Sequence, residues 1–382
     1  MLLETFLNKK PLYYDEIDYA RMPRVYTKIK HHFKTPQIIH LIGTNGKGTT
    51  GRFLASALNK LGYKVGHYTS PHILEFNERI WLNGEDVNDE LLENMHKKLL
   101  QILDTQDRDA LSYFEYTTLL AMLLYAECDY VVLEAGLGGE HDATAVFPKS
   151  LTLVTPIDKD HEAFLGDSIE SIATTKLNAV QNYAILAKQS YDKVYEIASL
   201  LAKEKDKEFY TLDYFIQKSD KEILEILQEE LSLAPYLLEN LSLAMAALHF
   251  FQIPFQKDIF HNAKLFGRLS CVQENVLVDV GHNTLAAKRI LESLREDKYI
   301  LVYNSYKDKN YKEILEILQP IIEDVYIIKV DEERIETREN MQVVLENLGF
   351  SYKDFTALQN DKKYLIFGSF SVVEAFLKGY IG

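Results

Sequence analysis

Eight consecutive residues have the composition of a phosphate-binding turn: they are Gly43, Thr44, Asn45, Gly46, Lys47, Gly48, Thr49 and Thr50. The glycines let backbone N–H groups turn toward a bound anion, and Lys47 supplies a mobile positive charge for the β- and γ-phosphates of a nucleotide. The general P-loop pattern is matched imperfectly, because Leu41 stands at its first glycine and Gly48 follows the lysine. The segment alone therefore fits either a nucleotide site or a glycine-rich turn with an exposed lysine.

Polar side chains follow two further apolar runs. Glu134 ends the run Tyr130–Glu134, and His161 comes shortly after the run Ser150–Thr155. A carboxylate oxygen beside a phosphate suits Mg²⁺, but a strand-end glutamate that caps a helix is an equal alternative for Glu134. His161 is a metal ligand, a general base or a plain loop residue, and its neighbours do not decide among these roles.

Other candidate groups lie further along the chain. Asp279 ends an apolar run and precedes His282 and Asn283. An aspartate at a strand tip can hold a ribose hydroxyl, and the other two residues are placed to meet a substrate across a cleft. The alternative is a helix that begins near Thr284 with Asn283 as its N-cap. Lys176, by itself, reads as an ordinary solvated helix lysine.

Apolar runs that alternate with helical patterns must position these groups. Gln37–Gly43 predicts a strand, 49–61 a helix and 64–68 a second strand, which together form a βαβ unit. The carboxyl ends of parallel strands line the ligand crevice in such sheets, so the candidate groups are expected at one edge. The charged stretch 192–233 predicts solvated helices and connections.

The fold class expected from this alternation is α/β in two domains, since 382 residues exceed the usual ~150 of one domain. Residues 1–268 are expected to form a P-loop-containing, mostly parallel sheet with helices on both faces. Residues 269–382 are expected to form a smaller Rossmann-like α/β domain. The segment 261–268 is the predicted hinge between them.

Net charge and cysteine content limit the function classes. Forty-two Lys and Arg against 57 Asp and Glu give a net charge of −15, which disfavours nucleic acid and anionic lipid as partners. The only cysteines are Cys128 and Cys271, too few for a disulfide framework. No signal-like or membrane-spanning run is apparent. We expect a cytoplasmic protein.

In this order, the segments resemble the folylpolyglutamate synthase and dihydrofolate synthase family of the Mur ligase superfamily. The resemblance extends from about His40 to Asn283. The motifs that carry it are residues 43–50, Thr69-Ser-Pro-His72 with Phe76–Ile80, Phe114-Glu115, Glu134–Gly139 with Asp142–Thr144, Asp160-His161, Gly267-Arg268 and Asp279–Asn283.

The resemblance implies an ATP-dependent amide ligase. Such an enzyme activates the carboxylate of dihydropteroate, or of a folate glutamyl tail, as an acyl phosphate, which the amino group of L-glutamate attacks; ADP and phosphate leave. It also implies Mg²⁺, with two ions expected, and we expect a monomer. Two alternatives remain: a Mur-type ligase for another carboxylate, such as a muramyl peptide, and a nucleotide-binding module without catalysis.

The resemblance also assigns roles to single residues. Ser70, Glu134 and His161 match the family's magnesium ligands; Ser70 is preferred to Thr49, which the P-loop pattern alone favours. Lys176 matches a lysine that the family carries N-carboxylated, which provides an anion for the second Mg²⁺. Catalytic roles are expected for Lys47, Lys176, His161 and His282, nucleotide contacts for Asn240, Arg268 and Asp279, and binding of the pterin-containing substrate for Phe114, Asp142, Ala143 and Thr144.

Overall fold

The structure is a computed structural model that describes residues 2–11, 18–261, 263 and 265–380. The chain divides into two compact units. The larger comprises residues 1–232 with 237–264, and the smaller comprises 265–382 with 233–236. The predicted hinge at 261–268 includes Asn262 and Lys264, which lie outside the described residues. The boundary expected at residue 268 stays a prediction.

The larger unit is built on an eight-stranded sheet in the order β4-β3-β2-β5-β1-β6-β7-β8. The six strands from β2 to β8 run parallel, and β3 and β4 pair antiparallel at one edge. Their bounds are β1 Gln37–Ile42, β2 Val65–Tyr68, β3 Ile80–Leu82, β4 Glu85–Asp86, β5 Tyr130–Glu134, β6 Leu151–Val154, β7 Tyr183–Leu186 and β8 Glu208–Thr211.

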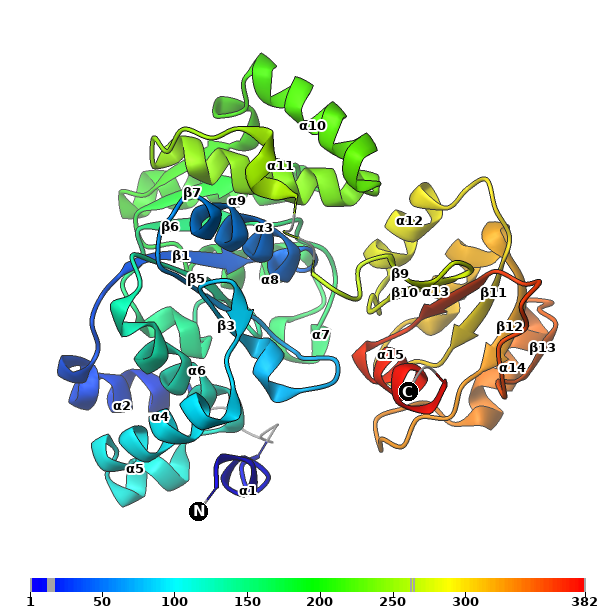
Figure 1. Cartoon of the computed structure of the whole chain (residues 1–382), viewed down its shortest axis with the longest axis horizontal. Helices are drawn as coiled ribbons and strands as arrows, with labels where there is room; N and C mark the ends of the chain where they lie inside the picture. Colours follow the sequence, from blue (N-terminus) through cyan, green and yellow to red (C-terminus); the bar gives the residue numbers. More distant parts are fainter. Residues whose placement is uncertain (1, 12–17, 262, 264, 381–382) are drawn as a thin grey trace. The chain divides into compact units, whose positions relative to one another are not determined.

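Helices cover both faces of this sheet, with α3 and α11 above it and α4 and α6 below it in Figure 1. The central strands are therefore apolar and buried along nearly their whole length. The α-helices are α1 Leu3–Leu7, α2 Arg21–Ile29, α3 Lys47–Lys60, α4 Asp89–Ile102, α5 Thr105–Ala110, α6 Tyr113–Leu124, α7 Glu162–Leu165, α8 Ile169–Leu177, α9 Asp192–Lys205, α10 Lys218–Leu231 and α11 Pro235–Phe250. The 3₁₀ turns are η1 Lys30–His32, η2 Phe76–Arg79, η3 Tyr125–Glu127, η4 Ala143–Val146, η5 Leu212–Tyr214 and η6 Lys257–Phe260.

Strand register decides which loops meet at the carboxyl edge. Leu41 on β1 is the partner of Glu134 on β5, and Ile42 is the partner of Val154 on β6. On the other side of β5, Tyr68 of β2 pairs with Leu133. The loops that follow β2, β5, β1 and β6 are therefore neighbours. They contain the predicted site residues 43–46, Ser70, 142–144 and His161.

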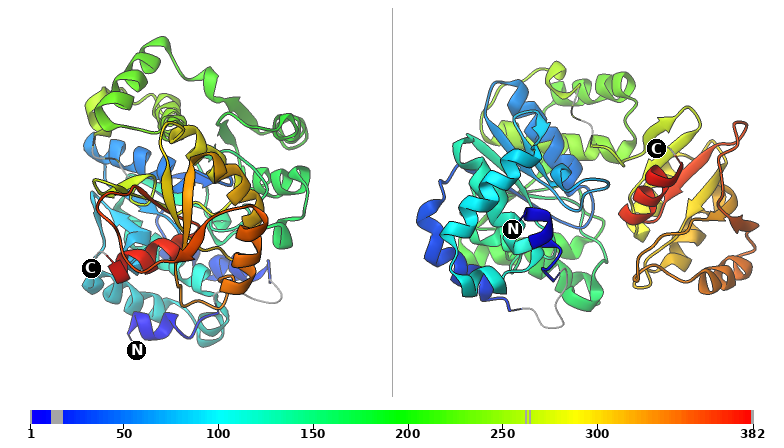
Figure 2. Two further views of the ribbon diagram at one scale, coloured as in Figure 1. Left: turned by 90° about the vertical axis from the view of Figure 1, so that its right-hand side faces the viewer. Right: turned by 60° about the horizontal axis from the view of Figure 1, so that its bottom comes forward.

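The smaller unit is a six-stranded sheet in the order β13-β12-β11-β14-β10-β9, parallel except for β9. Figure 2 (right) shows α15 on one side of this sheet and the orange helices on the other. Its strands are β9 Ser270–Gln273, β10 Val276–Asp279, β11 Tyr299–Tyr303, β12 Ile322–Ile327, β13 Tyr352–Asp354 and β14 Tyr364–Phe367. Its helices are α12 Thr284–Ser293, α13 Tyr311–Leu318, η7 Gln319–Ile321, α14 Arg338–Asn347 and α15 Phe370–Tyr380.

Both sheets confirm the predicted α/β class, but several strands were missing from the prediction. The stretch 192–233 contains α9 and α10 as expected, but it also supplies the edge strand β8, so its description as helices and connections was incomplete. The strands β3, β4, β7, β9 and β13 were not predicted either. Within the described ranges, no helix has the length and apolarity needed to cross a membrane.

Candidate active site

The loop between β1 and α3 has the backbone of an anion-binding turn. Gly43 and Gly46 have φ values of 138° and 92°, a region that side-chain-bearing residues rarely adopt. A Cβ atom on Gly46 would lie 2.4 Å from Asn240 Oδ1, so only glycine lets α11 approach the loop this closely. Gly46 is also the N-cap of α3, whose positive dipole end therefore faces the loop.

Side chains at the start of α3 have unused hydrogen-bonding capacity. The hydroxyl groups of Thr49 and Thr50 are buried and have no hydrogen-bond partner among the described residues. Lys47 Nζ folds back over the loop, 3.3 Å from the Gly43 carbonyl oxygen and 3.2 Å from that of Thr44. Buried hydroxyls without partners are costly, so this end of α3 suits a polar ligand.

The loop after β6 holds the P-loop from the other side. Thr44 Oγ1 donates to the Asp158 carbonyl oxygen at 2.9 Å and accepts from the Asp158 N–H group at 3.0 Å. The Thr44 N–H group donates to Pro156 at 2.9 Å. These three bonds fix the P-loop relative to the segment that leads to His161.

Glu134 lies beside the P-loop lysine. Its Oε1 atom is 4.0 Å from Lys47 Nζ, and both side chains are largely buried. Its Oε2 atom accepts hydrogen bonds from the Thr69 hydroxyl and, at 3.2 Å, from the Ser70 N–H group. The carboxylate is therefore oriented by the loop after β2, next to the charge that would meet a phosphate.

Lys176, on α8, is part of the same cluster. Its Nζ atom donates to the Gly43 carbonyl oxygen at 2.8 Å, and the side chain is buried. Burial, and to a lesser extent the positive charge of Lys47, lowers the pKa of Lys176 to about 7, against the opposing effect of Asp160. A Cβ atom on Gly139 would lie 2.9 Å from the Lys176 carbonyl oxygen, so the glycine-rich loop after Glu134 packs directly on α8.

His161 is positioned by Asp160. His161 has a left-handed backbone with φ 54°, its N–H group donates to Asp160 Oδ1 at 2.8 Å, and its ring lies 4.0 Å from the same oxygen. No group of three His, Cys, Asp or Glu side chains able to hold a metal ion occurs in the part of the chain that the structure describes. A metal here would need hydroxyl, phosphate or modified-lysine oxygens besides Glu134 and His161.

The predicted substrate segment follows the same glycine-rich loop. Asp142 accepts hydrogen bonds from the N–H groups of Gly136 and Leu137, both at 3.0 Å, and it caps η4, in which Ala143 and Thr144 are buried. The Phe114 ring lies against Gly136, where a Cβ atom would come within 2.8 Å of it. These residues form one contiguous group with Glu134.

The smaller unit brings its predicted residues together separately. Asp279 accepts hydrogen bonds from the Tyr236 hydroxyl at 3.0 Å and from the N–H groups of Leu269 and Gly281 at 3.0 and 2.8 Å. Burial raises the pKa of Asp279, and the charge of Arg268 opposes this rise. The His282 ring lies 3.2 Å from the Val280 carbonyl oxygen.

Asn283 caps α12 by accepting from the Ala286 N–H group at 3.0 Å, as the N-cap alternative predicted. Sequence reasoning named Thr69 only as part of the family motif and gave it no site role, and it did not name Tyr236. Both residues contact predicted site residues. A signal for Thr69 existed, because it directly precedes Ser70 at the end of a predicted strand.

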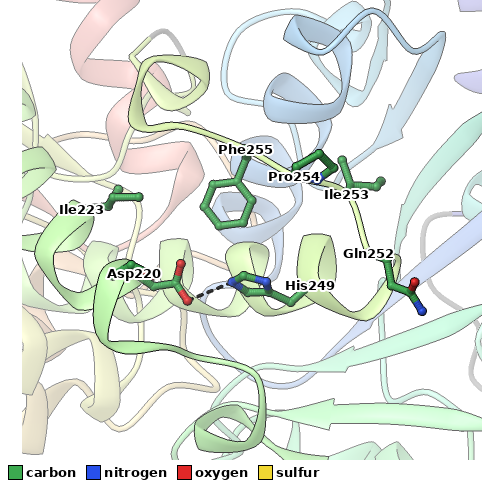
Figure 3. A pocket seen from close by; sticks show the side chains of 8 residues that line it. Asp220, Ile223, His249, Gln252, Ile253, Pro254 and Phe255 are labelled. Atoms are coloured by element: carbon green, nitrogen blue, oxygen red, sulfur yellow. Dashed lines mark hydrogen bonds and ion pairs between the residues drawn. The ribbon is translucent and has the colours of Figure 1, made fainter.

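A separate pocket of about 480 Å³ lies between α10 and α11 (Figure 3). Asp220 and His249, 2.8 Å apart, face Phe255 across it. None of the predicted site residues lines this pocket. The predicted site residues of the larger unit therefore lie around the carboxyl edge of the large sheet, and not in this pocket.

A parallel α/β fold with a glycine-rich loop at a helix N-terminus, and with a lysine beside a strand-end glutamate, defines a P-loop nucleotide-binding protein. Comparison with known proteins identifies the family within this class. The dihydrofolate synthase/folylpolyglutamate synthase of Escherichia coli (strain K12) is 33% identical over 336 residues, which cover 82% of this chain and 77% of that protein. The chain belongs to the dihydrofolate synthase/folylpolyglutamate synthase family, whose members are ATP-dependent ligases.

Solved structures agree with this assignment. Helicobacter pylori folylpolyglutamate synthetase shares 40% identity at a TM-score of 0.80, covering 98% of this chain and 97% of that one. The bifunctional folylpolyglutamate synthase/dihydrofolate synthase from Yersinia pestis, complexed with AMPPNP and a Mn ion, shares 25% sequence identity at a TM-score of 0.81. The match covers 98% of this chain and 96% of that one. The E. coli protein in complex with DHPP and ADP shares 25% sequence identity at a TM-score of 0.80. The match covers 98% of this chain and 95% of that one. No family model matches the chain. The predicted family and fold class are confirmed.

Proposed function

We propose that this protein uses ATP and Mg²⁺ to join L-glutamate to dihydropteroate, to the glutamyl tail of a folate, or to both. The acceptor carboxylate is activated as an acyl phosphate, which the glutamate amino group attacks, with release of ADP and phosphate. The observation that carries this proposal is the start of α3, where Lys47 lies 4.0 Å from Glu134 and two buried hydroxyls have no partner among the described residues.

Residues 43–50 and Asn240 would hold the triphosphate. Backbone N–H groups at the start of α3 and the Lys47 ammonium group would neutralise phosphate charge. A protein with a net charge of −15 needs such local positive groups to hold a polyphosphate. Arg268 and Asp279 of the smaller unit are further proposed nucleotide contacts, and His282 is proposed to meet the acyl phosphate or glutamate. Hydrogen bonds from the Leu269 and Gly281 N–H groups hold the Asp279 carboxylate in one orientation, which supports its proposed contact with the nucleotide.

The residues around Glu134 suit a hard divalent cation. Mg²⁺ supplies Lewis-acid stabilisation of phosphate charge when bound. Glu134, the Ser70 hydroxyl and His161 are its proposed ligands, and a carboxylated Lys176 is proposed for a second ion. The Thr69 and Ser70 hydrogen bonds to Glu134 fix this carboxylate, as outer contacts commonly do for metal ligands.

Carboxylation of Lys176 is chemically supported. The reaction joins the neutral amine to carbon dioxide and releases one proton, so it needs an unprotonated lysine. Because the pKa of Lys176 is lowered to about 7, the neutral amine is abundant at neutral pH. The resulting anion would lie beside the Lys47 charge, which stabilises it.

Phe114 and residues 142–144 are proposed to bind the pterin end of the acceptor. The Phe114 ring offers a stacking surface next to Gly136, and Asp142 orders the loop in which Gly136 lies. We further propose a monomer that works in the cytoplasm and does not bind nucleic acid. The unpaired state of Cys128 and Cys271 is consistent with a reducing compartment.

The test is acceptor-dependent phosphate release by the purified protein with ATP, Mg²⁺ and L-glutamate. Dihydropteroate, a reduced folate and a muramyl peptide serve as separate acceptors. Release with either pterin-containing acceptor supports the proposal. Release with the muramyl peptide alone favours the other ligase, and nucleotide binding without any release favours a non-catalytic module.

A further inference from the structure

A chain of hydrogen bonds connects the central strand β1 to the segment proposed to bind the pterin. His40 Nε2 lies 2.8 Å from Thr144 Oγ1, and the Thr144 hydroxyl donates to Asp142 Oδ1 at 2.5 Å. His40 and Thr144 are 0% exposed. His40 is therefore joined to Asp142 through a single hydroxyl group, out of contact with solvent.

The donors and acceptors set the direction of this chain. Asp142 also accepts from the N–H groups of Gly136, Leu137 and Thr144, so its oxygens receive four hydrogen bonds and act only as acceptors. A hydroxyl has one proton, and that of Thr144 is directed at Asp142. Its oxygen must then accept a hydrogen bond from the N–H group at His40 Nε2.

The protonation state of the other ring nitrogen, Nδ1, is consistent with this assignment. His40 Nδ1 is buried and has no partner among the described residues. Burial and the charge of Lys149 lower the pKa of His40 well below its usual range, so the ring is neutral and Nδ1 carries no proton. Thr152, the register partner of His40 on the neighbouring strand, has a buried hydroxyl that is likewise without a partner among the described residues.

We propose that His40 is a positioning residue for the acceptor site, which orients Asp142 through Thr144 and thereby holds the loop at Gly136. This inference rests on the proposed function. Asp142 binds two successive N–H groups of that loop, and Phe114 lies directly on Gly136. Loss of the His40 donor frees the Thr144 hydroxyl to rotate, and the loop then loses one of its supports.

The test compares two variants in the glutamate ligation assay. His40→Leu removes the donor at similar size, and His40→Gln keeps an N–H donor near the position of Nε2. We expect His40→Leu to raise the KM of the pterin-containing acceptor about tenfold, with KM for ATP within about twofold of wild type. His40→Gln should restore the acceptor KM to within about threefold. Thr144→Val should raise it as well, and His40→Leu should add nothing in that background.

His67 provides a matched control. It is also a fully buried histidine, on β2 of the same sheet, but its Nδ1 accepts from Arg52 and it does not join this chain. His67→Leu should lower the Tm without raising the acceptor KM. If His40→Leu does not fold, His40→Met takes its place, because it also lacks an N–H donor and leaves Thr144 unchanged.

Three results would overturn the inference while leaving the proposed function intact: an unchanged acceptor KM, equal increases for ATP and acceptor, or a His40→Gln variant as impaired as His40→Leu. A wild-type protein that shows no acceptor-dependent turnover overturns the proposed function itself, and the inference falls with it.

Discussion

The Lys176 ammonium group donates a 2.8 Å hydrogen bond to the carbonyl oxygen of Gly43, which ties the last turn of α8 to the first residue of the P-loop. The two residues are 133 positions apart in the sequence. The contact places a lysine whose pKa is lowered to about 7 next to the proposed phosphate site. A change in the charge of Lys176 will therefore change the electrostatic interaction energy with any bound triphosphate.

Activity should depend on carbon dioxide if Lys176 is carboxylated. The reaction needs the neutral amine, so modification and activity in limiting bicarbonate should rise with pH through about 7, where Lys176 loses its proton. Labelling with ¹³C-bicarbonate should give a carbamate NMR signal in the wild type that is absent from Lys176→Met. Lys203→Met, at an exposed position of α9, should keep both signal and activity; a signal that persists in Lys176→Met would refute the assignment.

Lys47→Ala should abolish ATP turnover while leaving the fold intact. The lysine supplies the mobile charge of the P-loop, and such groups contribute factors of about 10² or more to the rate. Lys60→Ala, at the exposed end of the same helix, is the control and should retain activity. Phosphate release and thermal unfolding measure the two properties, and turnover of Lys47→Ala near the wild-type rate would be inconsistent with the proposed cradle.

Thr69→Val should weaken metal use. The variant removes a hydroxyl that donates to Glu134 but leaves the carboxylate in place. Outer contacts of this kind typically change metal affinity by about 10- to 100-fold. We expect a higher Mg²⁺ concentration for half-maximal activity, with rate recovered at saturating Mg²⁺. Thr105→Val, exposed on α5, should leave the Mg²⁺ dependence unchanged; equal curves for the two variants would count against Glu134 as a ligand.

Lys149 should make stability depend on pH. Its buried ammonium group donates to the carbonyl oxygens of Ala145 and Phe147, and burial lowers its pKa from 10.5 to about 7. Between these values the unfolded chain holds a proton that the folded chain has lost, so raising the pH favours the folded state by up to about 1.4 kcal/mol per pH unit.

Lys149→Met removes this contribution. Urea unfolding across that pH range should therefore show a smaller rise in the free energy of unfolding for Lys149→Met than for the wild type. Below about pH 7 both states bind the proton, and the difference between the two proteins should stop changing with pH. Parallel pH curves across the whole range would contradict the lowered pKa of Lys149.

The central strands and the P-loop could be predicted from the sequence because buried parallel strands are continuous apolar runs and glycine turns have a distinct composition. The edge strand β8, Glu208–Thr211, could not, because it is short and half-exposed and lies among charged residues. The order of the strands in the large sheet could not be predicted from the sequence either. The contact of Thr69 with Glu134, 65 positions away, and that of His40 with Thr144, 104 positions away, arise only once β2, β5 and β1 lie side by side.

The most direct test of the proposed ligase is the mass of the acceptor after incubation of the purified protein with ATP, Mg²⁺ and L-glutamate. The account predicts that dihydropteroate or a folate gains the mass of one or more glutamyl residues, with one ADP formed for each, and that Lys47→Ala forms neither product. An acceptor of unchanged mass, with or without ATP consumption, would contradict it.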